Sequence, residues 1–231
     1  MPKNPWDSLS DYFDTHKPGS EIPAGAANNI LIAWPALMRG IEKVQSTGCG
    51  LRALDFGCGT GTFCARLLAQ GYEVIGCDSS SAMLRLARRN LGNVLRFVKI
   101  SQNLAELDGL KLDLITSIMV FQYIKEIDFT CRTLTRILRR HGILAFAVFD
   151  PDFVKRSTGP TLLFNADNKG IGTVMRPTNN VCIPVYARSR DYYDNLLQPL
   201  GYHRIYSATP RFQAKFLEKY PTLVLVYQRQ S

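Results

Sequence analysis

The sequence predicts a doubly wound α/β fold built on a seven-stranded, mostly parallel sheet. Short apolar runs of strand character alternate with amphipathic helical patterns over residues 51–150, which is the pattern of repeated βαβ units. The last two strand patterns, residues 202–208 and 222–230, are separated by about a dozen residues that include two prolines, which disfavours a helical crossover. We therefore expect these two strands to form an antiparallel hairpin at the edge of the sheet.

Each element is predicted from its periodicity and from the turn formers that bound it. The first helix covers residues 28–44, and Pro35 is expected to kink or break it. The helix after the second strand is capped by Ser79 or Ser80. The predicted strands are residues 51–57, 73–78, 95–100, 112–120, 142–150, 202–208 and 222–230, and the further helices are residues 61–71, 80–90, 128–140 and 189–201.

The alternation stops after Asp150. Residues 151–187 are rich in turn formers and contain two short strand patterns around a turn at residues 177–180. We interpret residues 151–187 as an inserted substrate cap over the carboxyl edge of the sheet. With 46% hydrophobic residues, the chain is expected to form a single domain, residues 1–231, that carries this insertion.

Charge and cysteine content restrict the function classes. The net charge of +9 is compatible with a nucleic-acid partner. However, arginines gather near the C-terminal ends of two predicted helices, at residues 85–90 and 136–141, where cations complement the helix dipole. This placement favours a small-molecule partner over nucleic acid. The six cysteines form no Cys-x-x-Cys pair, which predicts reduced, mostly buried thiols and no metal site.

The sequence also bears on localisation. No run of about 18 apolar residues is present that would span a bilayer. Residues 1–19 lack the basic-then-apolar order of a signal peptide. We therefore expect a cytoplasmic protein without a membrane span.

The stretch LDFGCGTG, residues 54–61, places three glycines directly after a strand pattern. Glycines at this spacing allow a backbone to turn tightly and lie against a ligand, and parallel sheets bind ligands at the carboxyl ends of their strands. The spacing is G-x-G-x-G, which differs from the G-x-G-x-x-G of dinucleotide-binding turns. Asp78 ends the next strand, where a carboxylate can accept hydrogen bonds from ribose hydroxyls. These features, without the Gly-Lys-Ser/Thr of a P-loop, predict a nucleoside ligand that lacks a pyrophosphate.

Together with residues 76–84 (GCDSSSAML) and 117–124 (SIMVFQYI), the glycine stretch resembles the class I S-adenosylmethionine-dependent methyltransferases. The similarity is to the small-molecule branch that includes the ubiquinone and menaquinone biosynthesis methyltransferases, and it covers nearly the whole chain. It implies a Rossmann-like fold, S-adenosylmethionine as cofactor and S-adenosylhomocysteine as product. It also implies in-line methyl transfer to an oxygen or nitrogen atom of a small-molecule acceptor.

The resemblance implies a cofactor site at the carboxyl ends of the strands. The glycine turn would lie beneath the amino-acid portion of the cofactor, supported by Asp55, and Asp78 would bind the ribose. At the end of the third strand, the family usually carries an acid that binds adenine, and this sequence has Ser101, Gln102 and Asn103 instead. The implied cofactor-binding residues are Asp55, Gly57, Cys58, Gly59, Gly61, Asp78, Ser79, Met83, Ser101, Gln102, Asn103 and Met119.

The resemblance also implies a lid and an acceptor site. Residues 1–47 correspond to an N-terminal helical lid, in which the family typically has a Tyr-Asp pair where this sequence has Phe13-Asp14. His16 in the lid is the candidate general base, and Gln122 is the candidate for orienting the acceptor near the transferred methyl group. The candidate acceptor contacts are Tyr12, Phe13, Tyr123, Arg176 and Tyr186.

Two other function classes stay open. The basic composition supports an RNA or protein methyltransferase, but the sequence lacks the Asn/Asp-Pro-Pro-Tyr/Phe signature that many amino-group methylating enzymes of nucleic acids carry after the fourth strand. The non-enzyme alternative is a catalytically inactive relative that keeps the fold, binds the cofactor and acts as an interaction protein.

Overall fold

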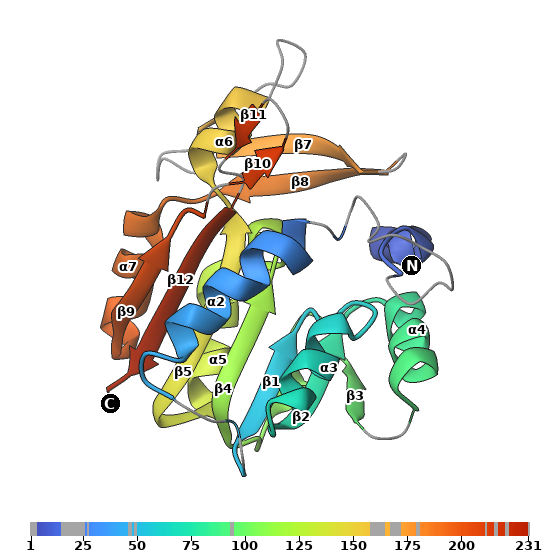
Figure 1. Cartoon of the computed structure of the whole chain (residues 1–231), viewed down its shortest axis with the longest axis vertical. Coiled ribbons are helices and arrows are strands. Elements are labelled where there is room, and N and C mark those ends of the chain that lie inside the picture. The colour runs from blue at the N-terminus through green and yellow to red at the C-terminus, as the bar shows by residue number, and fades with distance from the viewer. Residues whose placement is uncertain are drawn as a thin grey trace.

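A seven-stranded sheet forms the centre of the computed structural model, in the order β3-β2-β1-β4-β5-β12-β9 (Figure 1). The predicted α/β fold is therefore confirmed. The structure describes residues 4–14, 26, 28–45, 48, 50–92, 95–157, 165–166, 172–178, 181–210, 212–214, 217–219 and 222–230.

Five neighbouring strands of this sheet are parallel, and β12 (Thr222–Arg229), between β5 and β9 (Tyr202–Ala208), runs antiparallel to both of its neighbours. This pairing confirms the predicted edge hairpin. The order reverses between β1 and β4, because β2 and β3 lie on one side of β1 and β4 and β5 on the other. Such a switch point is where an open α/β sheet binds ligands. The parallel strands are β1 (Arg52–Phe56), β2 (Glu73–Asp78), β3 (Arg96–Lys99), β4 (Leu112–Ile118) and β5 (Leu138–Phe149).

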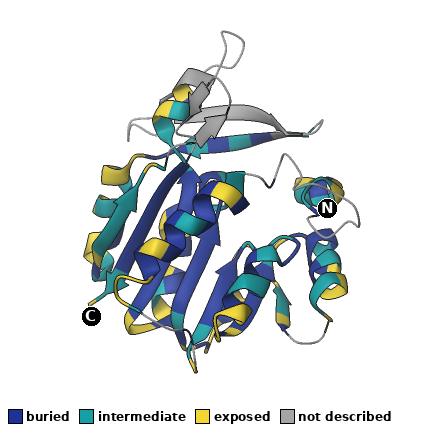
Figure 2. Cartoon of the chain, viewed as in Figure 1, coloured by how far each residue is buried: buried dark blue, intermediate teal, exposed yellow. Residues whose placement is uncertain are grey.

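Helices cover both faces of the sheet, so its strands are buried (Figure 2). One apolar cluster joins one face to α2 (Trp34–Ile41) and α3 (Thr62–Ala69), and a second joins the other face to α5 (Ile127–Ile137) and α7 (Arg190–Leu197). At the sheet edge formed by β3, α4 (Ser81–Leu91) begins at Ser80, whose hydroxyl accepts a hydrogen bond from the Met83 amide. Ser80 is thus the cap residue of the two that the sequence allowed.

Near Pro35, where a break was predicted, the helix changes from a π-helix to an α-helix. A π-helical stretch, η2 (Asn29–Ala33), precedes α2, and Pro35 lies in the first turn of α2. Proline has no amide hydrogen to donate, and the first turn is the place in a helix where that loss costs least. The single helix predicted over residues 28–44 is therefore divided at its proline.

The predicted boundary between the helix at residues 128–140 and the strand at residues 142–150 was wrong. α5 ends at Ile137, and Arg139 and Arg140 lie on β5 instead of the helix. Arg139 forms an ion pair of 2.8 Å with Asp113, and Arg140 donates to the Gln230 carbonyl oxygen. These partners are distant in sequence, which is why helical periodicity alone extended the helix through them.

The inserted segment forms its own small structure beyond the carboxyl end of β5 (Figure 1). It begins with α6 (Pro151–Ser157) and continues with β6 (Asn165–Ala166), β7 (Gly172–Thr178) and β8 (Val181–Ala187) in an antiparallel sheet. The two strands expected between residues 171 and 188 are thus present as β7 and β8.

The remaining described elements are short. The 3-10 helix η1 (Pro5–Tyr12) lies beside α4, and the 3-10 turns η4 (Ala105–Leu107), η5 (Phe121–Tyr123) and η6 (Gln198–Leu200) connect longer elements. A two-stranded hairpin of β10 (Phe212–Ala214) and β11 (Leu217–Lys219), which the sequence did not predict, precedes β12. In the described part of the chain, no helix has the length and apolarity needed to cross a membrane.

Aromatic rings form the centre of the apolar cluster between the sheet and α5, and removing one of them should lower stability. Phe146 is fully buried, and its ring lies 4.9 Å from the rings of Phe121 and Tyr193. Phe146→Ala is expected to lower the free energy of unfolding by about 3–5 kcal/mol, because the surrounding rings cannot close the cavity. Chemical denaturation measures this, with the half-exposed Phe129→Ala as control. Equal effects of the two substitutions would contradict the assignment of Phe146 to the core.

Candidate active site

A cavity of about 1200 Å³ lies at the carboxyl ends of the parallel strands. Its floor is made by the glycine turn after β1 and by the residues that follow β2, β3 and β4, and its outer walls include residues of η1, η2 and α6. Ligand pockets typically measure roughly 300–1000 Å³. This cavity therefore has room for two small molecules side by side.

The glycine turn fits the predicted role of approaching a ligand. Gly57 and Gly59 have φ values of 78° and 53°, which side-chain-bearing residues rarely adopt. A Cβ atom on Gly57 would lie 2.3 Å from Val120 Cγ2, so this glycine permits close packing against the segment after β4. A Cβ atom on Gly59 would meet nothing within 4 Å. Gly59 therefore leaves its side of the cavity open for a ligand.

The Asp78 carboxylate holds the turn in place and also lines the cavity. Its Oδ2 accepts a hydrogen bond of 2.9 Å from the Gly59 amide, and its Oδ1 accepts one of 2.8 Å from the Ser80 amide. Burial raises the pKa of Asp78, and these backbone donors oppose the rise. A carboxylate has about four lone-pair sites, so acceptor capacity remains for a ligand hydroxyl.

Asp55 lies behind the turn instead of in the cavity wall. It is 1% exposed, and Oδ1 accepts a hydrogen bond of 3.0 Å from the Thr116 hydroxyl while Oδ2 accepts one of 3.5 Å from the Cys64 thiol. Burial raises the pKa of this carboxyl group to about 6. These bonds join β1 to β4 and to α3, which is consistent with the supporting role that the resemblance implied.

Most of the residues predicted from sequence meet at this cavity. Among the other cofactor candidates, Gly61 packs against Leu91 and Ala87 of α4, and Asn103 accepts from Ser101 and from the Ala105 amide. Neither Gly61 nor Asn103 is in the cavity wall. The predicted residues that do line the cavity are Gly57, Cys58, Gly59, Asp78, Ser79, Met83, Ser101, Gln102, Met119, Tyr12, Phe13 and Tyr123.

Two other predicted residues, Gln122 and Tyr186, lie outside the cavity wall. Gln122 is 1% exposed with neither amide atom hydrogen-bonded, and it is not in the cavity wall. Tyr186 stacks on the Arg188 guanidinium at 5.0 Å and is also outside the wall. Arg176 belongs to β7, but its side chain is outside the described part of the structure. His16 lies outside the described residues, so its assignment as the base stays a prediction.

Met119 carries a backbone feature that sequence reasoning missed. Its φ is 58°, and its amide donates to the Ala147 carbonyl oxygen over 2.7 Å. A positive φ is uncommon in residues other than glycine, and such strain tends to persist at functional sites. Met119 directly follows β4 and lines the cavity. The strained residue therefore turns the chain from the sheet into the cavity wall.

The 3-10 helix η1 docks on α4 through Asp7. Its Oδ1 accepts hydrogen bonds of 2.6 Å from the Ser80 hydroxyl and 3.0 Å from the Ala82 amide, so it binds the N-terminal turn of α4. The Ser80 hydrogen bond is the largest cause of a lowered pKa at Asp7. The Asn4 amide also donates to the Ser79 hydroxyl over 3.2 Å. Sequence reasoning missed Asp7, for which the only signal was an acid in the lid motif.

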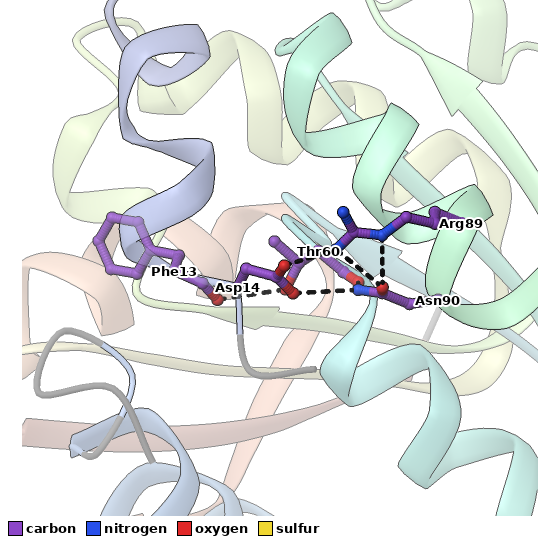
Figure 3. Close-up of polar contacts among 5 residues, drawn as sticks. All are labelled: Phe13, Asp14, Thr60, Arg89 and Asn90. Carbon is purple, nitrogen blue, oxygen red and sulfur yellow. Dashed lines mark hydrogen bonds and ion pairs between the residues drawn. The ribbon is translucent and has the colours of Figure 1, made fainter. Parts of the chain in front are cut away.

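Asp14, which follows the C-terminal end of η1, binds this end of the helix to α4 (Figure 3). This carboxylate is 1% exposed, forms an ion pair of 2.5 Å with Arg89 and accepts a hydrogen bond from the Asn90 amide. The Thr60 hydroxyl donates to the Phe13 carbonyl oxygen, which ties the lid to the glycine turn (Figure 3). Asp14 was not among the predicted site residues, although the Phe13-Asp14 pair pointed to this register.

Aromatic side chains form the outer part of the cavity. The Trp6 ring lies 4.8 Å from Tyr123 in an edge-on arrangement and 6.3 Å from Phe13, and Tyr123 lies 6.4 Å from Phe149. All four rings line the cavity. Trp6 and Phe13 come from the lid and Tyr123 from η5, so these elements share one apolar wall. Within the described ranges, no three histidine, cysteine or acidic side chains are grouped so as to hold a metal ion.

Comparison with known proteins agrees with this geometry. Residues 54–144 match the model of the family described as a methyltransferase domain. Over residues 54–144 the chain is therefore similar to a methyltransferase domain. The match begins at the glycine stretch and ends within β5, so this domain contains the floor of the cavity.

Two curated relatives and one solved structure illustrate the similarity. A ubiquinone biosynthesis O-methyltransferase of Sinorhizobium medicae is 30% identical over 105 residues, 44% of this chain and 42% of the relative. A malonyl-[acyl-carrier protein] O-methyltransferase of Geobacter sulfurreducens is 38% identical over 104 residues, 42% of this chain and 38% of the relative. The matches thus span less than half the length of these relatives. The magnesium protoporphyrin IX methyltransferase of Synechocystis, solved with bound S-adenosylhomocysteine, shares the fold with a TM-score of 0.65 at 16% identity, over 97% of this chain and 100% of the other.

The Asp14 contacts predict that the C-terminal end of η1 is held in place by Arg89 and Asn90. Asp14→Ala removes the ion pair with Arg89, and hydrogen exchange in residues 7–13 is expected to become about tenfold faster, since bonds to a charged partner contribute about 1.5–3 kcal/mol. Asp11→Ala is the matched control, because Asp11 is exposed on the same helix. Unchanged exchange in Asp14→Ala would show that the lid is held by other contacts.

The buried Asp55 predicts a pH dependence of stability. Its pKa is about 6 in the folded chain, above the ordinary value of 3.8, so the folded state keeps the proton that the unfolded state releases. Native stability should therefore fall as the pH rises from about 4 to about 6, by roughly 3 kcal/mol relative to Asp55→Asn, which cannot ionise. Denaturation of both proteins across this range measures the difference. A difference that is constant with pH would contradict a buried, ionising Asp55.

Proposed function

We propose that this protein transfers a methyl group from S-adenosylmethionine to an oxygen or nitrogen atom of a small-molecule acceptor that has an apolar or aromatic body. We also propose that it acts in the cytoplasm, as a single domain in which residues 1–47 serve as the lid and residues 151–187 as the substrate cap. The observation that carries the proposal is the cavity at the switch point of the sheet, where Gly59 is open and Asp78 is a partly buried acceptor.

The floor of the cavity suits the cofactor. Asp78 keeps lone pairs for the ribose hydroxyls, and the turn at Gly59 lets the backbone lie against the amino-acid portion. Ser79, Met83 and Ser101 line the part of the cavity beside Asp78, where the resemblance puts the adenine. When bound there, S-adenosylmethionine supplies an electrophilic methyl group on a positively charged sulfur.

The outer part of the cavity suits the acceptor. Trp6, Phe13, Tyr123 and Phe149 offer apolar faces that would bury a ring or chain and exclude water. The main catalytic requirement is to align the acceptor atom with the bond between sulfur and methyl carbon, and such alignment can contribute about 7–11 kcal/mol in model systems. An alcohol or phenol must also lose a proton, a role for which His16 is our candidate, whereas a carboxylate needs no base. Gln122 is not retained as an acceptor contact, because its buried side chain is not in the cavity wall.

Calorimetric titration with S-adenosylhomocysteine tests the cofactor half of this proposal, with NADH as the comparison ligand. The native protein is expected to bind S-adenosylhomocysteine and not NADH. Asp78→Ala is expected to weaken binding at least about tenfold, because the ribose loses a charged partner and the turn loses the bond at Gly59. Asp108→Ala, an exposed acid, is the control. Native-like affinity in Asp78→Ala would remove the ribose assignment.

A transfer assay tests the acceptor half. The protein is incubated with methyl-labelled S-adenosylmethionine and sets of phenols, carboxylic acids and amines, and in parallel with total RNA. Label in a small molecule that carries an apolar group supports the proposal. Label in RNA alone would favour the nucleic-acid alternative, and cofactor binding without any transfer would favour an inactive interaction protein.

A further inference from the structure

Arg188 is a buried cation that the function described so far does not use. It follows β8 at the junction with α7, and only 2% of its surface is exposed. Among the described residues it forms no ion pair, and its Nε atom has no hydrogen-bond partner. Burying an arginine without an acid is costly unless other groups compensate the charge. The compensating groups therefore indicate what this side chain does.

The guanidinium is bound to three backbone carbonyl groups of one short segment. Nη1 donates to the Phe121 carbonyl oxygen over 3.0 Å, and Nη2 donates to those of Ile124 and Lys125 over 2.7 and 3.1 Å. The rings of Tyr186 and Tyr192 lie 5.0 and 5.6 Å from the guanidinium carbon. The positive charge is thus balanced by carbonyl dipoles and aromatic faces, and all three bonds end in the segment that contains η5.

This segment is the acceptor-side wall of the cavity. Val120, Tyr123, Ile124, Lys125 and Glu126 all line it. The turn η5 is three residues long, its Phe121 carbonyl oxygen accepts from the Ile124 amide over 3.3 Å, and the Ile124 and Lys125 carbonyl groups follow the turn. The wall is therefore held from behind by Arg188, on the side away from the cavity, since Arg188 itself is not in the cavity lining.

The same segment contacts both the lid and the cap. Tyr123 packs against Trp6 of the lid, and with Phe149 it packs on a cluster formed by Val154 of α6 and Val185 of β8. A shift of the wall would therefore move the surface on which an acceptor rests. Because Arg188 directly follows β8, its bonds also hold the end of the inserted segment against the wall.

We propose that Arg188 is a positioning residue, which holds the wall of residues 120–126 at the distance from the cofactor floor that methyl transfer requires. This inference rests on the proposed function. The planar guanidinium suits the task because its five fixed donors can reach several carbonyl groups at once, whereas a lysine ammonium has three donors at one point. Arg188 would thus act through the wall and without touching the substrate.

Hydrogen exchange tests the proposal without an acceptor. In Arg188→Met, exchange of the segment 119–127 is expected to become about tenfold faster or more, while β1 and β4 keep native exchange. Arg188→Lys should lie between Arg188→Met and the native protein, and Arg190→Met, an exposed arginine two residues along, should match the native protein. Native exchange in the segment would overturn the proposal, and so would faster exchange throughout the sheet, because Arg188 would then stabilise the core in general.

Two binding readouts separate this inference from the proposed function. The Kd of Arg188→Met for S-adenosylhomocysteine is expected to stay within about threefold of native, because Gly59 and Asp78 are held by their own bonds. If the native protein binds no S-adenosylhomocysteine, the proposed function fails, while the exchange experiment still decides whether Arg188 holds the wall. With an acceptor from the transfer assay, the KM for the acceptor should rise about tenfold and that for S-adenosylmethionine about twofold at most. Equal increases would contradict a role on the acceptor side.

Discussion

The Asp78 carboxylate accepts hydrogen bonds from amides in two different turns, that of Gly59 after β1 and that of Ser80 at the start of α4. The partly buried carboxylate lies between these turns, and both turns curve toward it, so the ends of β1 and β2 meet beside Asp78. The lid depends on the same arrangement, because Asp7 binds Ser80 and the Ala82 amide. The shape of the cavity floor and the position of η1 thus both depend on the contacts of Asp78 and Ser80.

The outer part of the cavity is held by different interactions. Its wall is a short turn whose carbonyl groups are bound by the buried Arg188, and its surface is formed by aromatic rings from the lid, η5 and β5. The part of the chain that is similar to a methyltransferase domain, residues 54–144, contains the cavity floor, whereas η1 and Arg188 lie outside it.

The sequence predicted those features that local pattern determines. Strand and helix periodicity gave the sheet, and the glycine spacing with Asp78 gave the place of the cavity, because both are encoded within a few residues. The buried roles of Asp14 and Arg188 could not be predicted in this way, since their partners lie about 65–75 positions away and an isolated charged residue is usually exposed. The misplaced end of α5 has the same cause, because Arg139 leaves the helix to pair with Asp113 of β4.

The central claim is that the cavity floor at Gly59 and Asp78 holds S-adenosylmethionine. The most direct measurement is a crystal structure of the protein with S-adenosylhomocysteine. The account predicts ribose hydroxyl groups within hydrogen-bond distance of the Asp78 carboxylate, and the amino-acid portion against the open side of Gly59, with the sulfur facing the aromatic wall. A ligand bound elsewhere, or bound in this cavity without contact to Asp78, would contradict it.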